Sequence, residues 1–331
     1  MRRVLTTAIL FLLGTAGVLH AQIPGPLQEE EEFKVFTPQN AEGYFKPLYT
    51  SLQEGFATNL YTTAQYDEKW NIALDISVMG MFIPDDHKTF EAILPESYAD
   101  SAQSQTAELR NGIINRNVSG TSIQPTVFGD ISNPVFSAPQ SEEIPTLFNR
   151  MVGTVGFPEG NDINLMPGPP HFQLILGGPT RTELRTRIVP IPGGDRTFLY
   201  LGFGLNQQID HFMNLFGEDS TMGLAVNTSF HYMNLTETMD ATGFTGGLHF
   251  SKSWDGFTLF TGAQYETMTG DFMAEILDNE TIAFDLESFN SFRLLGGASY
   301  RNGAIEIHAD GALAAQPVIS AGLTIWIASF K

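Results

Sequence analysis

The stretch RTELRTR gathers three arginines and a glutamate within seven residues and is the first place to look for chemistry. Alternate residues of a strand point to the same face, so this stretch, if extended, places three guanidinium groups beside one carboxylate. The four side chains are Arg181, Glu183, Arg185 and Arg187. Guanidinium groups bind anions through charge-assisted hydrogen bonds, so one interpretation is a basic strip that attracts an anionic or carboxylate-bearing solute.

A second interpretation gives these arginines a structural role. An arginine that is buried without a partner is costly, and acids outnumber lysines and arginines in this chain by 37 to 17. The arginines would then pair with nearby acids and brace the wall of the fold or a plug. The acids that we expect there are Glu183, Asp75 and Asp210. The sequence leaves both interpretations open.

A second charged group lies on the inward faces of two neighbouring predicted strands. Its members are Arg293, Arg301, Glu306, His308 and Asp310. Bracing is again the simpler interpretation, because a proton relay or a metal site requires the histidine and the acids to converge in space. Cysteine is absent, and the seven histidines show no metal-ligand spacing. We therefore expect no metal and no other cofactor.

The pair His249-x-Ser251 is a candidate for nucleophilic hydrolysis. Such catalysis needs a base beside the hydroxyl and an acid that orients the base. Leu248 and Phe250 take the alternate positions, so His249 and Ser251 point away from the side that would face lipid. No GxSxG motif is present either. We therefore expect a protein that is not an enzyme.

Long strands are predicted to position these residues. Apolar and polar residues alternate in segments that begin at Trp70, Leu199, Met222, Phe292 and Ile305. A period of two is typical of strands with one apolar face. The segments run for about 9 to 13 residues, whereas strands of soluble domains average about 5 to 6 and tilted membrane strands need about 9 to 11.

Short polar connections and aromatic residues near the predicted strand ends add to this pattern, since aromatic girdles mark the membrane interfaces of barrels. A large soluble β-sandwich would explain the alternation but not the strand length. We predict an all-β fold: an antiparallel transmembrane β-barrel of about 12 to 14 strands.

The C-terminal stretch GLTIWIASFK predicts the strand that closes this barrel, because a barrel in lipid must pair its last strand with its first and leave no edge. Its alternation is similar to the insertion signal of barrel proteins, at Ser320, Gly322, Ile325, Ile327 and Phe330. Outer-membrane lipid and the barrel-assembly machinery are the partners that this implies.

Residues 1–21 have the layout of a cleavable secretory signal peptide, with Arg2 and Arg3 before an apolar run. That run is about fifteen residues, short of the roughly 20 that a membrane-spanning helix needs. Cleavage would change the formal net charge from −20 to −22, because the segment holds two arginines and no acid. So acidic a chain repels nucleic acid. We expect export to the outer membrane.

The mature chain divides into two predicted regions. Residues 22–54 form an acidic, solvated tail and a short helix from Pro47 to Glu54, and residues 55–331 form the barrel. The insertion at 84–170, rich in Pro, Ser, Asn and Gln, predicts a large loop, a plug or extra strands, with one short helix around Tyr98 to Leu109. We expect part of this insertion to fold into or over the lumen.

Three blocks of the sequence carry a resemblance to a known family. They are YFKPLYTSLQEGFATNLYTTAQYDEKWNIALDISVMGMFIP, LMPGPPHFQLILGGPTRTELRTRIVPIP and FLYLGFGLNQQIDHF. The chain resembles an uncharacterised family of outer-membrane barrel proteins from Gram-negative bacteria. More remotely it is similar to the long-chain fatty-acid transporter barrels, which have an inserted N-terminal plug. Their Asn-Pro-Ala plug signature is absent here, so no ligand is carried over from them.

The function that we expect is passage or capture of a small solute, apolar or amphipathic, across the outer membrane. The alternative is a structural, adhesion or secretion-associated barrel with a closed lumen. The candidate solute contacts are the two charged groups described above.

Overall fold

The computed structural model describes residues 37–93, 121–129, 160–193, 196–216, 221–235, 239–277, 280–289 and 292–330. The predicted signal peptide, the acidic tail, the predicted helix around Tyr98 to Leu109 and much of the 84–170 insertion lie outside these ranges.

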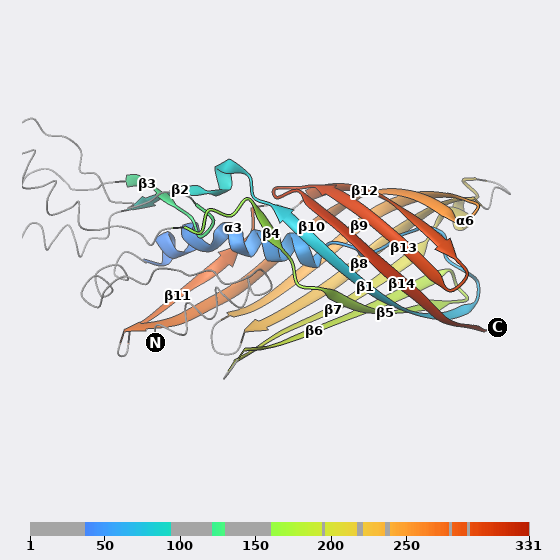
Figure 1. The fold of residues 1–331 in the computed structure, drawn as a ribbon, viewed down its shortest axis with the longest axis horizontal. Coiled ribbons are helices and arrows are strands. Elements are labelled where there is room, and N and C mark those ends of the chain that lie inside the picture. The colour runs from blue at the N-terminus through green and yellow to red at the C-terminus, as the bar shows by residue number, and fades with distance from the viewer. Residues whose placement is uncertain are drawn as a thin grey trace, which may run out of the picture.

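Ten antiparallel strands pair in a ring and close into a barrel (Figure 1). Around the ring they are β1 (Trp70–Phe82), β5 (His171–Gly178), β6 (Thr182–Gly193), β7 (Arg196–Gln208), β8 (Met222–Leu235), β9 (Met239–Trp254), β10 (Phe257–Leu277), β12 (Phe292–Asn302), β13 (Ile305–Leu313) and β14 (Val318–Phe330). The predicted all-β antiparallel barrel is confirmed. The alternation of apolar and polar residues sets the strands, because it gives each of them one inward and one outward face.

The ring has fewer strands than the 12 to 14 that we expected. Two further strands belong to the same sheet but flank the ring: β4 (Leu165–Pro167) pairs with the end of β1, and β11 (Glu280–Glu287) pairs with β10. The described part of the 84–170 insertion adds β2 (Thr89–Ile93) and β3 (Thr121–Pro125), which form a separate two-stranded sheet. Some ring strands are also longer than the predicted 9 to 13 residues: β9 has 16 residues and β10 has 21, so fewer strands account for the same length of chain.

The C-terminal strand closes the barrel, as predicted. β14 pairs with β1 in an antiparallel register that runs from Trp70 opposite Phe330 to Met81 opposite Val318. The other edge of β14 pairs with β13. Both edges of the last strand are therefore hydrogen-bonded.

A helix, α3 (Pro38–Phe56), lies before the first strand. It is longer than the predicted helix from Pro47 to Glu54, because it begins at an N-cap that the prediction missed. The Thr37 side chain accepts a hydrogen bond from the Asn40 amide, and Pro38 occupies the first turn. Pro47 therefore lies inside the helix. The other helical segments are the 3₁₀ turn η1 (Asp85–His87) and α6 (Asp210–Met213).

Residues 37–66 fill the barrel, and we call this segment the plug. In α3, 14 of the 19 residues are buried, on all sides of the helix. No side chain from 57 to 66 is exposed. In Figure 1, α3 lies along the long axis of the barrel, and the chain that follows it continues towards the end where the C-terminus lies.

The described pieces of the 84–170 insertion contact the first half of α3. The Asn40 side chain exchanges two hydrogen bonds with the main chain of Ile93, and the Val127 amide donates to the Tyr44 carbonyl. The expectation that the insertion folds into or over the lumen stays a prediction for its other residues.

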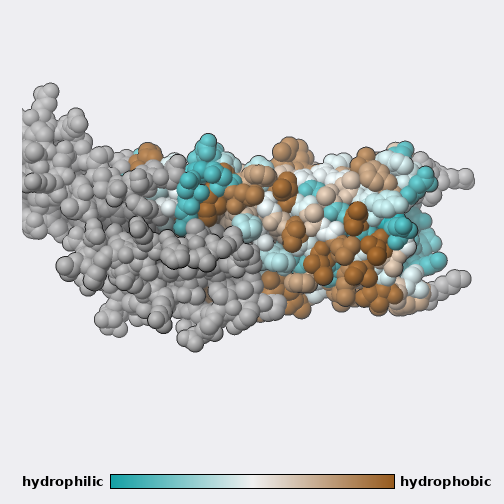
Figure 2. Space-filling view, in the orientation of Figure 1, coloured by the Kyte–Doolittle hydropathy of each residue, from teal (hydrophilic) through white to brown (hydrophobic). Residues whose placement is uncertain are grey.

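The outer surface of the barrel is apolar. Large apolar side chains with more than a third of their surface exposed occur on all ten strands of the ring; examples are Ile76, Phe172, Ile188, Phe203, Phe230, Leu248, Leu259, Leu294, Ile307 and Ile325. Figure 2 shows such residues gathered on one face, with hydrophilic residues at the end of the barrel. Among the described helices, none is long and apolar enough to cross a membrane.

Candidate functional site

The inward-facing side chains of the strands change from polar to apolar along the barrel. On β1 the inward residues are Asp75 and Ser77, followed by Met79 and Met81. The same change from polar to apolar occurs on β6, β8, β13 and their neighbours. The lumen therefore has a polar zone, which surrounds residues 57–66, and an apolar zone, which surrounds α3.

Methionine lines much of the apolar zone. Six of the 11 methionines of the chain lie in one buried cluster with the apolar residues of α3, and they come from five strands: Met79, Met81, Met166, Met233, Met239 and Met268. From α3 this cluster takes Phe45, Leu48, Leu52 and Phe56. Methionine is flexible and polarizable, so such a wall adapts to apolar groups of different shapes.

Arg187 lies where the two zones meet, and its guanidinium binds the end of α3. Nη1 donates to the Phe56 carbonyl (2.8 Å), and Nη2 donates to the carbonyls of Thr58 (2.7 Å) and Asn59 (2.5 Å). Nε donates to Oε1 of Gln173 (2.9 Å). The last carbonyls of a helix carry partial negative charge and have no intrahelical partner. A cation at this position therefore fixes the plug.

The charge of Arg187 is balanced differently from that of its neighbours. Arg185 and Arg293 lie within 4 Å of carboxylates, and so does the other buried cation in the described ranges, Lys88. Arg187, 2% exposed, contacts no carboxylate of the described residues. Its charge is met by carbonyl dipoles, the Gln173 amide, the ring of His171 (3.4 Å) and the Tyr200 hydroxyl.

Arg293, on β12, binds the same end of α3 from the opposite side of the ring. Nη1 donates to the Glu54 carbonyl (3.1 Å), and Nη2 donates to Oγ1 of Thr58 (3.0 Å). The carboxylates of Glu54, on the plug, and Glu266, on β10, lie 3.6 and 3.5 Å away. The plug is thus held between arginines of β6 and β12.

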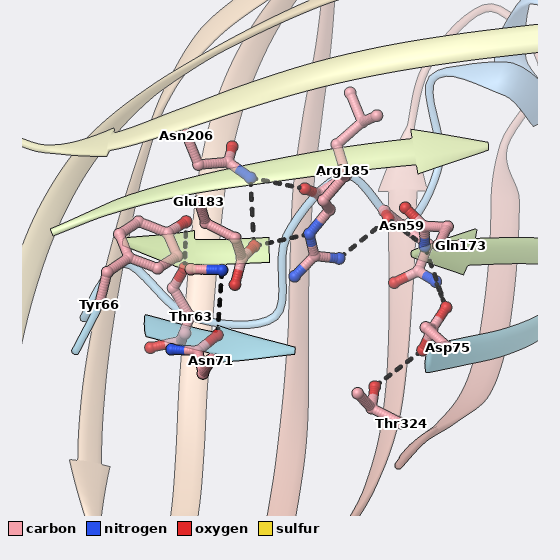
Figure 3. Close-up of polar contacts among 12 residues, drawn as sticks. Asn59, Thr63, Tyr66, Asn71, Asp75, Gln173, Glu183, Arg185, Asn206 and Thr324 are labelled. Carbon is pink, nitrogen blue, oxygen red and sulfur yellow. Dashed lines mark hydrogen bonds and ion pairs between the residues drawn. The ribbon is translucent and has the colours of Figure 1, made fainter. Parts of the chain in front are cut away.

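Arg185 pairs with an acid on its own strand. Its Nε lies 2.7 Å from Oε1 of Glu183, and both side chains are buried (Figure 3). Asn206 donates to the same carboxylate and to the Leu60 carbonyl (3.1 Å). Nη1 of Arg185 donates to the Asn59 carbonyl (3.4 Å). This wall pair therefore also touches the plug.

Asp75 is the second centre of the polar zone (Figure 3). Its Oδ1 accepts from the side-chain amides of Asn59 and Gln173, each at 2.9 Å. Its Oδ2 accepts from Thr324 (2.8 Å) and lies 2.7 Å from Nε2 of His308. Four partners from the plug and three strands converge on one buried carboxylate. A carboxylate that is saturated in this way is a structural anchor.

Gly322 lets His308 reach Asp75. His308 is on β13 and Asp75 is on β1, with β14 between them. A Cβ at position 322 would lie 2.4 Å from Cε1 of the His308 ring. Gly322, predicted as part of an insertion signal, therefore has a packing role in the folded barrel.

Two predicted lumen arginines lie outside the lumen. Arg181 is in the turn before β6, with φ of 55°, and donates two hydrogen bonds to the exposed Glu68. The alternation fails there because the strand begins one residue later. Arg301 has the inward parity, but it lies at the exposed end of β12, with its guanidinium 4.1 Å from the centre of the Trp326 ring.

The remaining predicted residues have the expected faces. Glu306 is buried and accepts from the Trp326 indole (3.1 Å), and Asp310 accepts from the Ser320 hydroxyl (2.5 Å). The apolar members of the predicted insertion signal point outward and are exposed: Ile325, Ile327 and Phe330.

The histidine and serine of the predicted hydrolase pair contact the plug. The Ser251 hydroxyl accepts from the Ala64 amide (2.8 Å), and its Oγ lies 3.3 Å from Oγ1 of Thr63. Nε2 of His249 lies 3.0 Å from the Tyr66 hydroxyl, and the His249 ring stacks on Tyr61 at 3.8 Å. Both side chains therefore bind the plug, and no hydrogen bond joins His249 to Ser251.

The plug side of the site was missed from the sequence. The plug groups that Arg187 binds are main-chain carbonyls of residues 56, 58 and 59, which have no side-chain signature. Arg293 also binds the Glu54 carbonyl, and its side-chain partners on the plug are Glu54 and Thr58. Asn59, with φ of 56°, is the one detectable feature, since asparagine tolerates this left-handed conformation. In the described part of the chain, no group of three or more His, Asp or Glu side chains could hold a metal ion.

Comparison with known proteins gives a family and distant similarities to solved structures. Residues 1–327 match the model of a family described as a family of unknown function (DUF6588). No curated protein matches the chain significantly. The chain is similar to a bacterial polysaccharide outer membrane secretin, with 9% identity over 78% of this chain and 99% of that chain and a TM-score of 0.31.

Two other solved structures are similar at the same level. LpxR from Salmonella typhimurium shows 10% identity over 77% of this chain and 100% of that chain, with a TM-score of 0.30. OccK8 (OprE) from Pseudomonas aeruginosa shows 9% identity over 76% of this chain and 70% of that chain, with a TM-score of 0.16. Similarities this low carry no information on what this chain does.

Proposed function

We infer the function of this chain, which belongs to the DUF6588 family of unknown function, from its own geometry. We propose that it is an outer-membrane β-barrel in which the plug controls the passage or capture of a small solute. Outer-membrane lipid and the barrel-assembly machinery are its proposed partners.

The apolar outer surface is the observation that carries the proposal. All ten strands of the ring expose large apolar side chains, and contact with water is unfavourable for such a surface by about 25 cal/mol per Å². A continuous apolar band around a closed barrel, with polar groups inside, suits a bilayer. Exposed aromatic residues lie at one end of the barrel, where an interfacial girdle would be: Trp70, Trp254, Tyr300 and Phe330.

The lumen supports the role of the plug. The plug is one continuous segment, and its contacts with the wall are hydrogen bonds and ion pairs rather than covalent links. It enters the lumen from the end where α3 begins and is continuous with β1 at the other end. Movement of this segment would clear the lumen without breaking a pair of strands.

A closed barrel with a structural role is the second candidate. The contacts of Arg187, Arg293 and Asp75 with the plug favour it, because a moving plug would have to break three hydrogen bonds of Arg187, two of Arg293 and one of Asp75. The proposal includes no enzymatic step, since His249 and Ser251 are both bound to the plug.

Planar-bilayer conductance of residues 22–331 tests the proposal. Arg187→Met removes three hydrogen bonds to plug carbonyls while keeping an unbranched side chain of similar length. Arg181→Met is the matched control, because Arg181 contacts the exposed Glu68 in a turn outside the lumen. We expect rare openings in the unchanged chain and in Arg181→Met, and frequent openings in Arg187→Met.

Heat-modifiable migration on gels shows whether each variant forms a barrel. If Arg187→Met and the unchanged chain both form heat-stable barrels that never conduct, control of passage by the plug is wrong. The closed structural barrel would then be the better account.

A further inference from the structure

We propose that Arg187 is the headgroup site for an amphipathic anion, whose apolar part takes the place of α3 in the methionine-lined zone. This inference rests on the proposed function, because the plug must leave the site before such a ligand can enter.

Among the buried cations of the described ranges, Arg187 is the one that has no carboxylate within 4 Å, and three of its hydrogen bonds would be lost with the plug. Arg185 would keep Glu183, and Arg293 would keep Glu266, because both acids are on the wall. Arg187 would keep the neutral wall partners Gln173, His171 and Tyr200, and it would reach the Asp75 carboxylate only through Gln173. A buried guanidinium that contacts no carboxylate is a strong site for a carboxylate, sulfonate or phosphate group.

The plug itself occupies this site with groups of the same electrostatic character. Three carbonyl oxygens, from Phe56, Thr58 and Asn59, point at Nη1 and Nη2. The end of a helix carries about half a negative charge. The oxygens of an acidic headgroup could accept the same hydrogen bonds and add a full charge.

The apolar part of the ligand has a path that begins beside Arg187. The Phe56 ring of the plug stacks on Tyr200 with 3.9 Å between ring centres, at the start of the buried apolar cluster. Val189, the next inward residue of β6, belongs to the same cluster. Beyond these two residues the wall is the methionine cluster, which adapts to chains of different shape. An acid head at Arg187 would therefore have its apolar tail in the space of α3.

The anion and α3 compete for the same donors, so binding of either excludes the other. A ligand that binds only the open state shifts the barrel towards that state. The solute would thus open its own path, whereas a neutral apolar solute of equal length would gain nothing from Arg187.

Equilibrium dialysis with the full chain in nanodiscs tests the site, with empty nanodiscs as the blank. The probes are radiolabelled decanoate, decanol with the same tail but no charge, and acetate with the same head but no tail. We expect saturable binding of decanoate, about tenfold tighter than that of decanol, and none of acetate. Arg187→Gln should remove the preference for decanoate, and Arg181→Gln should keep it.

A measurement on the unchanged chain covers the case in which Arg187→Gln does not fold. Decanoate should speed the amide hydrogen exchange of residues 50–60, and decanol at the same concentration should not. Equal binding of decanoate and decanol, or decanoate binding without faster exchange, would overturn the site. If Arg187→Met conducts but no probe binds, the ligand class is wrong and the moving plug remains.

Discussion

Nε2 of His308 lies 2.7 Å from Oδ2 of Asp75, across the strand that separates them in the barrel wall. This contact ties β13 to β1 over β14, where the last strand meets the first. Asp75 also accepts from Asn59 of the plug. The closure of the barrel and the position of the plug therefore depend on the same carboxylate.

Gly322→Ala should weaken this closure. The new Cβ would lie 2.4 Å from the His308 ring, so the ring must leave Asp75 or β14 must shift. Overpacking of this kind costs about 1 to 3 kcal/mol. We expect a lower midpoint of thermal unfolding, measured by circular dichroism in detergent.

Gly204→Ala is the matched control. Gly204 is also an inward-facing glycine of the ring, but its nearest neighbours, Arg185 and Ser229, would lie 3.7 Å from a new Cβ. The midpoint of thermal unfolding of Gly204→Ala should stay near that of the unchanged chain. Equal midpoints for both variants would show that Gly322 is not needed for the His308 contact.

Ser251→Ala should loosen the plug without affecting lipid. It leaves the buried Ala64 amide without its acceptor, which costs about 1 to 3 kcal/mol. Hydrogen exchange in a peptide that contains residues 60–66 should become faster, and the lipid composition of the outer membrane should stay the same. Altered lipid composition in cells that express this variant would instead favour a hydrolase.

The 3₁₀ turn η1 should detach from the barrel as pH falls. Burial lowers the pKa of His87 below its usual 6.5, and nearby Asp86 raises it only in part. Nδ1 of His87 accepts from the Gln316 amide (3.3 Å), and its ring stacks on Phe289. A detached His87 binds a proton more readily than a docked one, so docking is most stable above pH 6.5 and weakens below it.

Hydrogen exchange of residues 84–93 at pH 7.5 and pH 5.0, corrected for the intrinsic rates, measures this effect. Protection should be lower at pH 5.0 in the unchanged chain and independent of pH in His87→Leu. Equal protection of the unchanged chain at both pH values would refute the role of His87.

Brominated lipids should quench the tryptophan fluorescence of the refolded protein. Two of the three tryptophans, Trp70 and Trp254, are exposed on the outer surface at one end of the barrel. Bromine near the headgroups should quench more strongly than bromine at the chain ends, since this end is proposed to lie at the interface. An absence of quenching would contradict insertion in a bilayer.

The sequence predicts the strands of the barrel wall better than the plug that fills the lumen. Alternation over Trp70 to Phe82 gives the bounds of β1, and the same period places Glu183, Arg185 and Arg187 on the lumen face. These predictions succeed because each strand separates an apolar exterior from a polar interior. Arg181 and Arg301 lie where the strands begin or end, and there the barrel no longer separates an apolar exterior from a polar interior. The alternation therefore does not predict whether these side chains face the lumen.

The plug could not be assigned in the same way. α3 has apolar residues at helical spacing, but its polar side chains, such as Asn40, Ser51 and Glu54, are buried as well. A helical period with a polar face is typical of a helix on a surface, so it does not predict a helix that fills the lumen. The contacts of the chain after α3 with Arg185, Arg187 and Asn206 use main-chain carbonyls, which every residue has. The length and composition of 84–170 instead predicted that the plug would come from that insertion. The described segment that fills the lumen is 37–66.

The central claim, a barrel whose passage depends on movement of the plug, is tested most directly by fixing the plug to the wall. The γ-oxygens of Thr63 and Ser251 are 3.3 Å apart, and the chain has no cysteine, so Thr63→Cys with Ser251→Cys offers one defined disulfide. Conductance is then recorded in the Arg187→Met background before and after reduction. We predict silent barrels when the disulfide is intact and frequent openings after reduction. Equal conductance in both states would contradict the account, because the current would then not depend on the plug.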